Sequence, residues 1–463
     1  MKTIFIGIFS PNQVRNFLLI PDGVFGLLKK AGLKIVLLVP STACEQIKKD
    51  FVGENIFVES IIVDWKRNFL QNLYYFISSY LNFTEGARLF AWMGVRIDVP
   101  VADKKRWFYP LKVFIAETIG KSRWIRMSLM LRLDNLVYYK RPHKEIFDKY
   151  NPNLVFVPDV LSAPGASLVR EAKRQNIKTI GMPASWDHLP KRFEPLHVDN
   201  LLVWNELLKK EAINLQNYHE NNTFVIGVPQ YDAFAQKNLL WSREEFMKKF
   251  NFDQSKKTIF FSSSSVYAPD DGDIAEILIN AIKEKKFSCP AQLFIRPYPG
   301  ITIDHEKFDR FDSQESVYID WIEQKKIFGH SGFAWYPTFD SMIHFANLLY
   351  HCDIIISTYS SVSVEASAFS KPIININFDG FKNRPFNQSV KRFKHLSHFK
   401  HVLETNGVRQ AENEEDLLRA INEFLKNPDV NKENVVKLRD KMCWKIDGKS
   451  SERIANHLLG CLK

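Results

Sequence analysis

The stretch from residue 352 to residue 376 constrains the fold of this chain more than any other. The β-branched run 354–356 ends in a turn rich in serine and threonine, a helix-like segment carrying one acid follows, and a second β-branched run begins just after Pro372. Short, continuous apolar runs of this kind are typical of strands that are buried on both faces of a parallel sheet. The pattern therefore predicts a strand, a phosphate-sized turn, a helix and a second strand.

The turn in this unit suits an anion. Backbone N–H groups at the start of a helix have no intrahelical partner, and the helix dipole adds partial positive charge there. Hydroxyl groups are available along the turn from Ser357, Thr358, Ser360 and Ser361. Glu365 lies one turn further on, where its carboxylate can accept hydrogen bonds from a ribose diol. These five residues are candidate ligands of a donor nucleotide, although a serine-capped helix without a ligand explains the same pattern.

The remainder of the chain repeats the alternation of strand and helix in two series. With 463 residues, the chain exceeds the usual size of a single core, which predicts two domains. We expect an α/β fold of two Rossmann-like, doubly wound domains that face a cleft. The first would span residues 1–240 with a helical insertion at about 65–150. The second would span 241–445, and a last helix within 446–463 would cross back to the first domain.

Charge and cysteine content narrow the partners. The net charge of +11 suits anionic partners such as nucleotide sugars, acidic glycans or phospholipid surfaces. The sequence contains no recognisable nucleic-acid-binding module, so nucleic acid is not an expected partner. The five cysteines include no C-x-x-C pair, which indicates reduced thiols and a cytoplasmic protein.

A helical apolar stripe in residues 69–81 has two interpretations. One is burial in the first domain, which apolar stripes favour in general. The other is peripheral contact with an anionic membrane at the inner face of the plasma membrane, because aromatic and basic residues alternate in the nearby segments 104–109 and 121–126. No apolar run approaches the ~20 residues that a membrane-spanning helix requires.

Two motifs at expected strand ends of the first half are candidates for acceptor binding and catalysis. Arg15 and Asn16 follow the first strand, where they could contact an acceptor or a phosphate, or simply cap the next helix. Asp187 and His188 follow a later strand, and a carboxylate beside an imidazole is a candidate general base for a hydroxyl group. The alternative for Asp187 is that it caps the following turn.

Two further motifs fall in the second half. Arg296, at the end of the run 292–295 and followed by two prolines around Tyr298, can fork onto a diphosphate through charge-assisted hydrogen bonds. Ser262 and Ser263 follow the first strand of that half and offer another hydroxyl-rich turn for a phosphate. A surface arginine and an ordinary polar loop are the alternatives.

We expect no metal and no cofactor. The acidic run 270–273 resembles a metal-binding D-x-D signature, but it directly precedes a helical pattern with Glu276 three residues after Asp273, which favours a capping box. The histidines at 395, 398 and 401 fan across a helix without an acid or cysteine beside them, which favours surface imidazoles over a ligand set.

Taken together, these motifs resemble the GT-B glycosyltransferase superfamily, and within it the bacterial surface-polysaccharide branch related to UDP-GlcNAc 2-epimerases and CDP-glycerol glycerophosphotransferases. The segments that carry the resemblance are 185–187, 203–205, 226–232, 296–299, 357–365, 371–373 and 378–380. One departure is Tyr298, because relatives often have histidine in an R-x-H-P motif at this point. A tyrosine supplies a hydroxyl group but no cation at neutral pH.

The resemblance implies that the second domain binds a nucleotide-activated donor and that the first holds the acceptor. We therefore expect metal-independent transfer of a sugar from a nucleotide sugar to a hydroxyl of a surface glycan or lipid-linked acceptor. Asp187 would be the base if the reaction inverts the anomeric centre. The alternatives are a CDP-glycerol-type polyol-phosphate transferase, an epimerase of the UDP-GlcNAc 2-epimerase kind, and a non-catalytic subunit that binds nucleotide or glycan.

Overall fold

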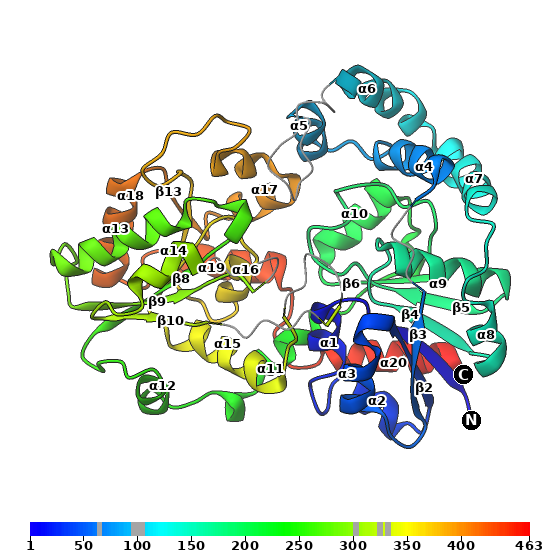
Figure 1. Cartoon of the computed structure of the whole chain (residues 1–463), viewed down its shortest axis with the longest axis horizontal. Coiled ribbons are helices and arrows are strands. Elements are labelled where there is room, and N and C mark those ends of the chain that lie inside the picture. Colours follow the sequence, from blue (N-terminus) through cyan, green and yellow to red (C-terminus); the bar gives the residue numbers. More distant parts are fainter. Residues whose placement is uncertain (63–66, 94–106, 300–304, 322–326, 329–334) are drawn as a thin grey trace.

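The chain forms two separate parallel sheets, each flanked by helices (Figure 1). The computed structural model describes residues 1–62, 67–93, 107–299, 305–321, 327–328 and 335–463. Within these residues both sheets contain only parallel strands. This confirms the predicted α/β class with two doubly wound sheets.

The first sheet has seven strands in the order β3-β2-β1-β4-β5-β6-β7. Its central strands are almost wholly apolar and buried, as expected for strands covered on both faces. The strands are β1 (Thr3–Gly7), β2 (Lys34–Pro40), β3 (Ile56–Ile61), β4 (Leu154–Val157), β5 (Lys178–Gly181), β6 (Asn200–Val203) and β7 (Thr223–Val225).

The second sheet has six strands in the order β10-β9-β8-β11-β12-β13. The predicted β-branched runs on either side of the serine-rich turn form its strands β11 and β12, which pair in parallel through Ile355 and Ile373. The strands are β8 (Lys257–Ser262), β9 (Ala291–Arg296), β10 (Val317–Ile319), β11 (Ile354–Ser357), β12 (Ile373–Ile376) and β13 (Arg409–Ala411).

Helices connect the strands within each half. Those of the first half are α1 (Pro11–Phe17), α2 (Val24–Lys30), α3 (Ser41–Phe51), α9 (Ala163–Arg174), α10 (Glu206–Gln216) and α11 (Asp232–Ala235). Those of the second half are α12 (Arg243–Lys249), α13 (Asp271–Lys283), α14 (His305–Phe308), α15 (Phe339–His351), α16 (Val362–Ser367), α17 (Ser397–Leu403), α18 (Glu414–Lys426) and α19 (Lys432–Met442).

A helical insertion separates β3 from β4. It comprises α4 (Phe69–Ser79), α5 (Glu85–Met93), α6 (Tyr109–Glu117), α7 (Met130–Val137) and α8 (Lys144–Tyr150). The predicted apolar stripe of residues 69–81 is only partly buried. Tyr74 and Leu81 are buried, whereas Phe69 and Leu70 are exposed. Further along, Gly86 N donates to Ser397 Oγ at 3.0 Å, so α5 touches α17 of the other half (Figure 1).

The last helix, α20 (Ser450–Leu462), packs on α2 and β4 of the first half. Buried Asp232 anchors its start, because its carboxylate accepts from Ser450 N at 2.9 Å and from Ser451 N at 2.7 Å. Gly227 passes close to the same point with a φ of 89°, and a Cβ there would lie 2.3 Å from Ser450 Oγ. The domain boundaries near residues 240 and 445 stay predictions.

We expect Asp232→Ala to lower the free energy of unfolding by about 1–2 kcal/mol, because two buried helix-start amides lose their acceptor. Denaturant unfolding of purified protein measures the change. Asp22→Ala is the control, since that exposed carboxylate pairs only with exposed Lys30 and should change stability by less than about 0.5 kcal/mol. Equal stability of the two variants would contradict the anchoring role.

Candidate functional site

A cavity of about 230 Å³ lies where the carboxyl ends of the two sheets meet. Arg15 and Asn16 of α1 line it from the first half, together with the loop that follows β5. From the second half it is lined by residues at the ends of β8 and β9 and by the start of α16. The loops that follow parallel strands gather at one edge of a sheet, so two facing edges enclose a site made from both halves.

Eight of the predicted site residues line this cavity. They are Arg15, Asn16, Ser262, Arg296, Tyr298, Ser360, Ser361 and Glu365. They come from four separate segments of the chain, so only the tertiary fold brings them together. The roles that the sequence predicts for them stay predictions.

Arg15 is a cation in this cavity without a close carboxylate partner. Its Nε donates to Asn16 Oδ1 at 3.4 Å, and no acid of the described residues forms an ion pair with it. Burial lowers the pKa of its guanidinium, whereas the nearby Glu365 carboxylate raises it. An arginine stays protonated under such conditions, so the cavity contains a positive charge with unused donors.

Neighbouring side chains of the second half fix the orientation of Arg296. Its guanidinium forms an ion pair with Asp320, and Asp320 also accepts from His344 Nε2 at 3.2 Å if that nitrogen carries the proton. The guanidinium carbon lies 5.0 Å from the centre of the Phe345 ring. One carboxylate and one ring fix the orientation, and the remaining N–H groups are available to a ligand in the cavity.

Glu365 is buried and connects the two halves. Its Oε1 accepts from Gln230 Nε2 of the first half at 2.9 Å. Burial raises the pKa of the carboxyl, while Arg15, Gln230 and Arg296 lower it. Glu365 therefore lies at the point where both cations and both halves converge.

The two serine turns contribute less to the cavity than the sequence suggested. Ser357 bonds to Ser363 (Oγ–Oγ 3.1 Å), and Ser263 Oγ donates to Asp271 Oδ2 at 2.9 Å. Thr358 Oγ1 also points to Asp271, at 3.4 Å. These three predicted ligands therefore bond within the protein and do not line the cavity.

The helix behind the second turn is short. α16 has six residues, and Ser360 Oγ accepts from Val362 N at 3.3 Å. A helix of this length adds little dipole field, so Arg15 and Arg296 are the main positive charges of the cavity. Tyr359, in the turn, has a φ of 44°, a left-handed conformation that is uncommon for a residue with a side chain.

Asp187 and His188 lie beside the cavity in a half-buried charged cluster and do not line it. Burial alone would raise the pKa of Asp187, but Lys191, His188 and His398 hold it well below its usual range. Burial, followed by the charge of Lys191, lowers the pKa of His188. At neutral pH the cluster therefore holds an ionised carboxylate next to a neutral imidazole.

Two further residues join this cluster: His398, which the sequence predicted to be a surface imidazole, and Glu211, which it did not single out. His398 of α17 packs edge-on against Trp186 with ring centres 5.1 Å apart, and burial lowers its pKa to about 4. Glu211 of α10 is buried, and burial, reinforced by the Asp187 charge, raises its pKa to about 8. The surface position predicted from the three-residue histidine spacing is wrong for His398, because its side chain is buried. In the structure α17 faces the first half.

The acidic run 270–273 has a different structural role from the predicted one. Helix α13 begins at Asp271, so Asp273 lies inside its first turn and does not cap it. Asp270 instead forms ion pairs with Lys382 and Arg384, while Asp271 fixes the Ser263 turn. In the part of the chain that the structure describes, no three His, Cys, Asp or Glu residues are grouped to hold a metal ion.

Comparisons with known proteins agree with this architecture. The family model described as CDP-Glycerol:Poly(glycerophosphate) glycerophosphotransferase matches residues 321–460. The UDP-GlcNAc 2-epimerase from Neisseria meningitidis, solved bound to UDP-GlcNAc, superposes with a TM-score of 0.55 at 12% identity, covering 99% of this chain and 100% of that one. MnaA of S. aureus, solved with UDP, gives 0.53 at 12% identity, covering 99% and 96%.

The UDP-GlcNAc 2-epimerase of Methanocaldococcus jannaschii gives a TM-score of 0.51 at 14% identity, covering 99% of this chain and 100% of that one. No curated protein matches the sequence. The structural likenesses extend over both sheets and show that the chain has the GT-B fold. This confirms the fold that the motifs predicted.

Glu211 generates a prediction for stability against pH. Its carboxyl keeps a proton in the folded state up to about pH 8, whereas its ordinary pKa is 4.5. The unfolded chain loses that proton first, so Glu211 makes folding less favourable as pH rises through this window. We expect Glu211→Gln to gain stability relative to wild type between pH 5 and pH 8, measured by denaturant unfolding.

The matched control is Glu206→Gln, at an exposed position on the same helix. Its stability difference from wild type should not depend on pH over this window. A Glu211→Gln difference that is equally constant would show that the buried carboxyl does not retain its proton.

Proposed function

We propose that this protein transfers a polyol phosphate, and specifically glycerol phosphate from CDP-glycerol, to a terminal hydroxyl of a poly(glycerophosphate) chain. The family match over residues 321–460 carries the proposal, because this segment supplies Ser360, Ser361 and Glu365 to the cavity. The match favours the polyol-phosphate alternative over the sugar transfer that we first expected.

The cavity has the charges that this reaction needs. The acceptor oxygen forms a bond to the glycerol-bearing phosphorus, the bond from that phosphorus to the bridging oxygen breaks, and CMP leaves with the electron pair. Negative charge grows on the bridging and non-bridging oxygens in the transition state. Arg15 and Arg296 are positioned to stabilise it, since both line the cavity and Asp320 orients the second. Glu365 would accept hydrogen bonds from the cytidine ribose.

The acceptor hydroxyl must lose a proton. We assign this step to Asp187 and His188, with the neutral imidazole as the proton acceptor and the ionised carboxylate as the group that stabilises the resulting imidazolium. Two features support this assignment. His188 Nε2 lies 4.0 Å from Asp187 Oδ1, and the Asp187 charge raises the pKa of Tyr298 in the cavity wall, after burial.

A donor panel tests the proposal. Purified protein with a short poly(glycerophosphate) primer should release CMP from CDP-glycerol, and should leave UDP-GlcNAc, UDP-glucose and GDP-mannose unchanged. Transfer from a nucleotide sugar would restore the glycosyltransferase interpretation. Conversion of UDP-GlcNAc without an acceptor would identify an epimerase, and CDP-dependent stabilisation without turnover of any donor would identify a binding subunit.

Arg15→Gln should lower kcat/KM for CDP-glycerol by about 10- to 100-fold, the loss of one charge-assisted hydrogen bond to a phosphate. The substitution leaves no carboxylate without its ion-pair partner. Arg132→Gln, at an exposed position on α7, is the matched control and should leave kcat/KM unchanged. Equal activity of the two variants would remove Arg15 from the donor site.

We also propose that the insertion rests on an anionic membrane. None of the described helices is long and apolar enough to cross a membrane. However, exposed aromatic side chains cluster around α6, namely Trp107, Phe108, Phe114 and Trp124. Exposed Lys121 and Arg123 lie close to them in sequence, whereas the predicted basic residues 104–106 lie outside the described residues.

Wild-type protein should co-sediment with vesicles that contain phosphatidylglycerol and much less with neutral vesicles. The double variant Trp107→Ala/Phe114→Ala should weaken this association at least about tenfold, because each ring loses its burial in the interface. Sedimentation that does not depend on these rings would argue against this surface.

A further inference from the structure

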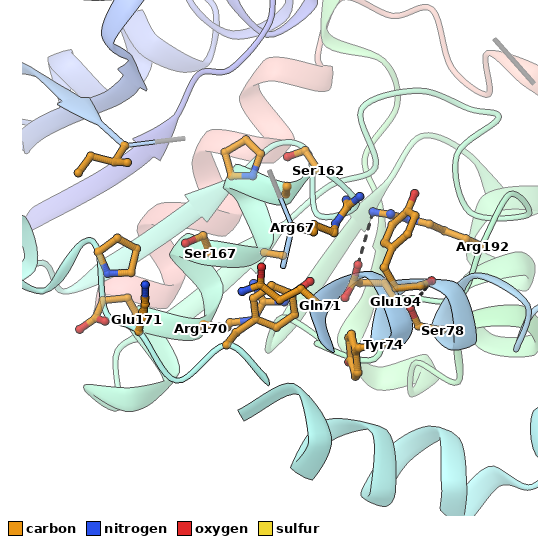
Figure 2. Close-up of a pocket in the computed structure, with 18 of the residues that line it drawn as sticks. Arg67, Gln71, Tyr74, Ser78, Ser162, Ser167, Arg170, Glu171, Arg192 and Glu194 are labelled. Atoms are coloured by element: carbon orange, nitrogen blue, oxygen red, sulfur yellow. Dashed lines mark hydrogen bonds and ion pairs between the residues drawn. The ribbon is translucent and has the colours of Figure 1, made fainter. Parts of the chain in front are cut away.

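A second cavity, of about 320 Å³, lies between the insertion and the first sheet. Tyr74 and Tyr75 of α4 form one wall, and Arg170 of α9 contributes to the opposite one. Arg192 and Glu194, in the loop between β5 and β6, also line it (Figure 2). Cavities of this size commonly hold small ligands.

The charges around this cavity are mostly positive. It is lined by the cations Arg67, Lys140, Arg170, Arg174 and Arg192, but only by the carboxylates Glu171 and Glu194. An anionic ligand would therefore be favoured over a neutral or cationic one.

Some of these cations are already paired within the protein, and others keep N–H donors for a ligand. Arg170 is bound in bidentate fashion by buried Asp134, at 2.6 and 2.8 Å. Among the described residues, the Arg174 guanidinium donates to backbone carbonyls only. The Arg192 guanidinium forms an ion pair with Glu194, with 3.6 Å between Nη2 and Oε2. Within the described residues Arg67 forms no ion pair. Arg67 and Arg192 are thus the cations best able to meet a ligand.

These two arginines converge on one aromatic ring. The guanidinium carbon of Arg67 lies 3.7 Å from the centre of the Tyr75 ring, and that of Arg192 lies 5.1 Å from it. Figure 2 shows the two guanidinium groups pointing toward one another. Burial would raise the pKa of the Tyr75 phenol, but Arg192 and Arg67 lower it. Two guanidinium groups beside an aromatic wall form a suitable clamp for a phosphate attached to a polyol or sugar.

One loop connects this cavity to the first. The segment between β5 and β6 places Ser185 and Trp186 in the wall of the first cavity, and Arg192 and Phe193 in the wall of the second. His188 lies between these two pairs of residues along the chain. A chain-like ligand with its end in the first cavity could therefore place an earlier unit in the second.

We propose that the second cavity binds a phosphodiester-linked polyol unit of the acceptor, clamped by Arg67 and Arg192, while the acceptor's terminal hydroxyl lies in the first cavity. This inference rests on the proposed function for the identity of the acceptor. It assigns to the insertion a role in holding the growing polymer.

The test measures binding of a synthetic glycerol phosphate trimer by titration calorimetry, with glycerol 3-phosphate and inorganic phosphate as comparison probes. Arg67→Gln should raise the dissociation constant of the trimer by about tenfold, as expected for one lost charge-assisted hydrogen bond. The same variant should bind CDP-glycerol as wild type does. In turnover its KM for the primer should rise while kcat stays unchanged.

Arg67→Gln is the primary variant because it leaves no carboxylate unpaired. Arg192→Gln should act in the same direction, and Arg132→Gln, on the same insertion, should have no effect. Trimer binding that is unaffected in both clamp variants, or that inorganic phosphate matches in affinity, would overturn the inference. Trimer binding that depends on Arg67 in a protein that does not use CDP-glycerol would instead overturn the proposed function and retain the anion site.

Discussion

Parallel pairing of every strand is the constraint on which the rest of this structure depends. All seven strands of one sheet and all six of the other run the same way within their sheet, so each sheet gathers its strand-to-helix loops at a single edge. The two edges meet at one cavity. A polar residue after one strand can therefore contact a polar residue more than a hundred positions away, as Gln230 and Glu365 do.

Within that cavity the two arginines differ in how they are held. Arg296 forms an ion pair with Asp320, whereas Arg15 donates to the Asn16 amide and forms no ion pair within the described residues, although the Glu365 carboxylate lies near it. Because Arg296 is already oriented, its side chain loses little entropy when a diphosphate binds. Arg15 supplies positive charge that no ion pair within the protein has already neutralised. Glu365 is too deeply buried to be an ordinary surface acid, and it ties both charges to the junction of the two halves.

The sequence was sufficient for the fold and for part of the site, for distinct physical reasons. Buried parallel strands are mostly apolar, so their apolar runs predicted strands β8 and β11. The position of Arg296 at the end of such a run predicted that it belongs to the site. Hydroxyl content did not reveal the direction in which each side chain points. Ser263 and Thr358 turn inward because Asp271, which lies 8 positions from Ser263 and 87 from Thr358 in sequence, accepts from both. No local pattern predicts such a shared partner.

The loop between β5 and β6 contributes residues to both cavities, and the insertion forms one wall of the second cavity. That loop is longer than most connections between neighbouring strands, and different parts of it line the two cavities. Its middle carries Asp187 and His188, packed against Lys191 and against α17 of the other half. A group bound at the Arg192 end and a group bound at the Trp186 end would therefore both contact one continuous segment, the same segment that carries Asp187 and His188.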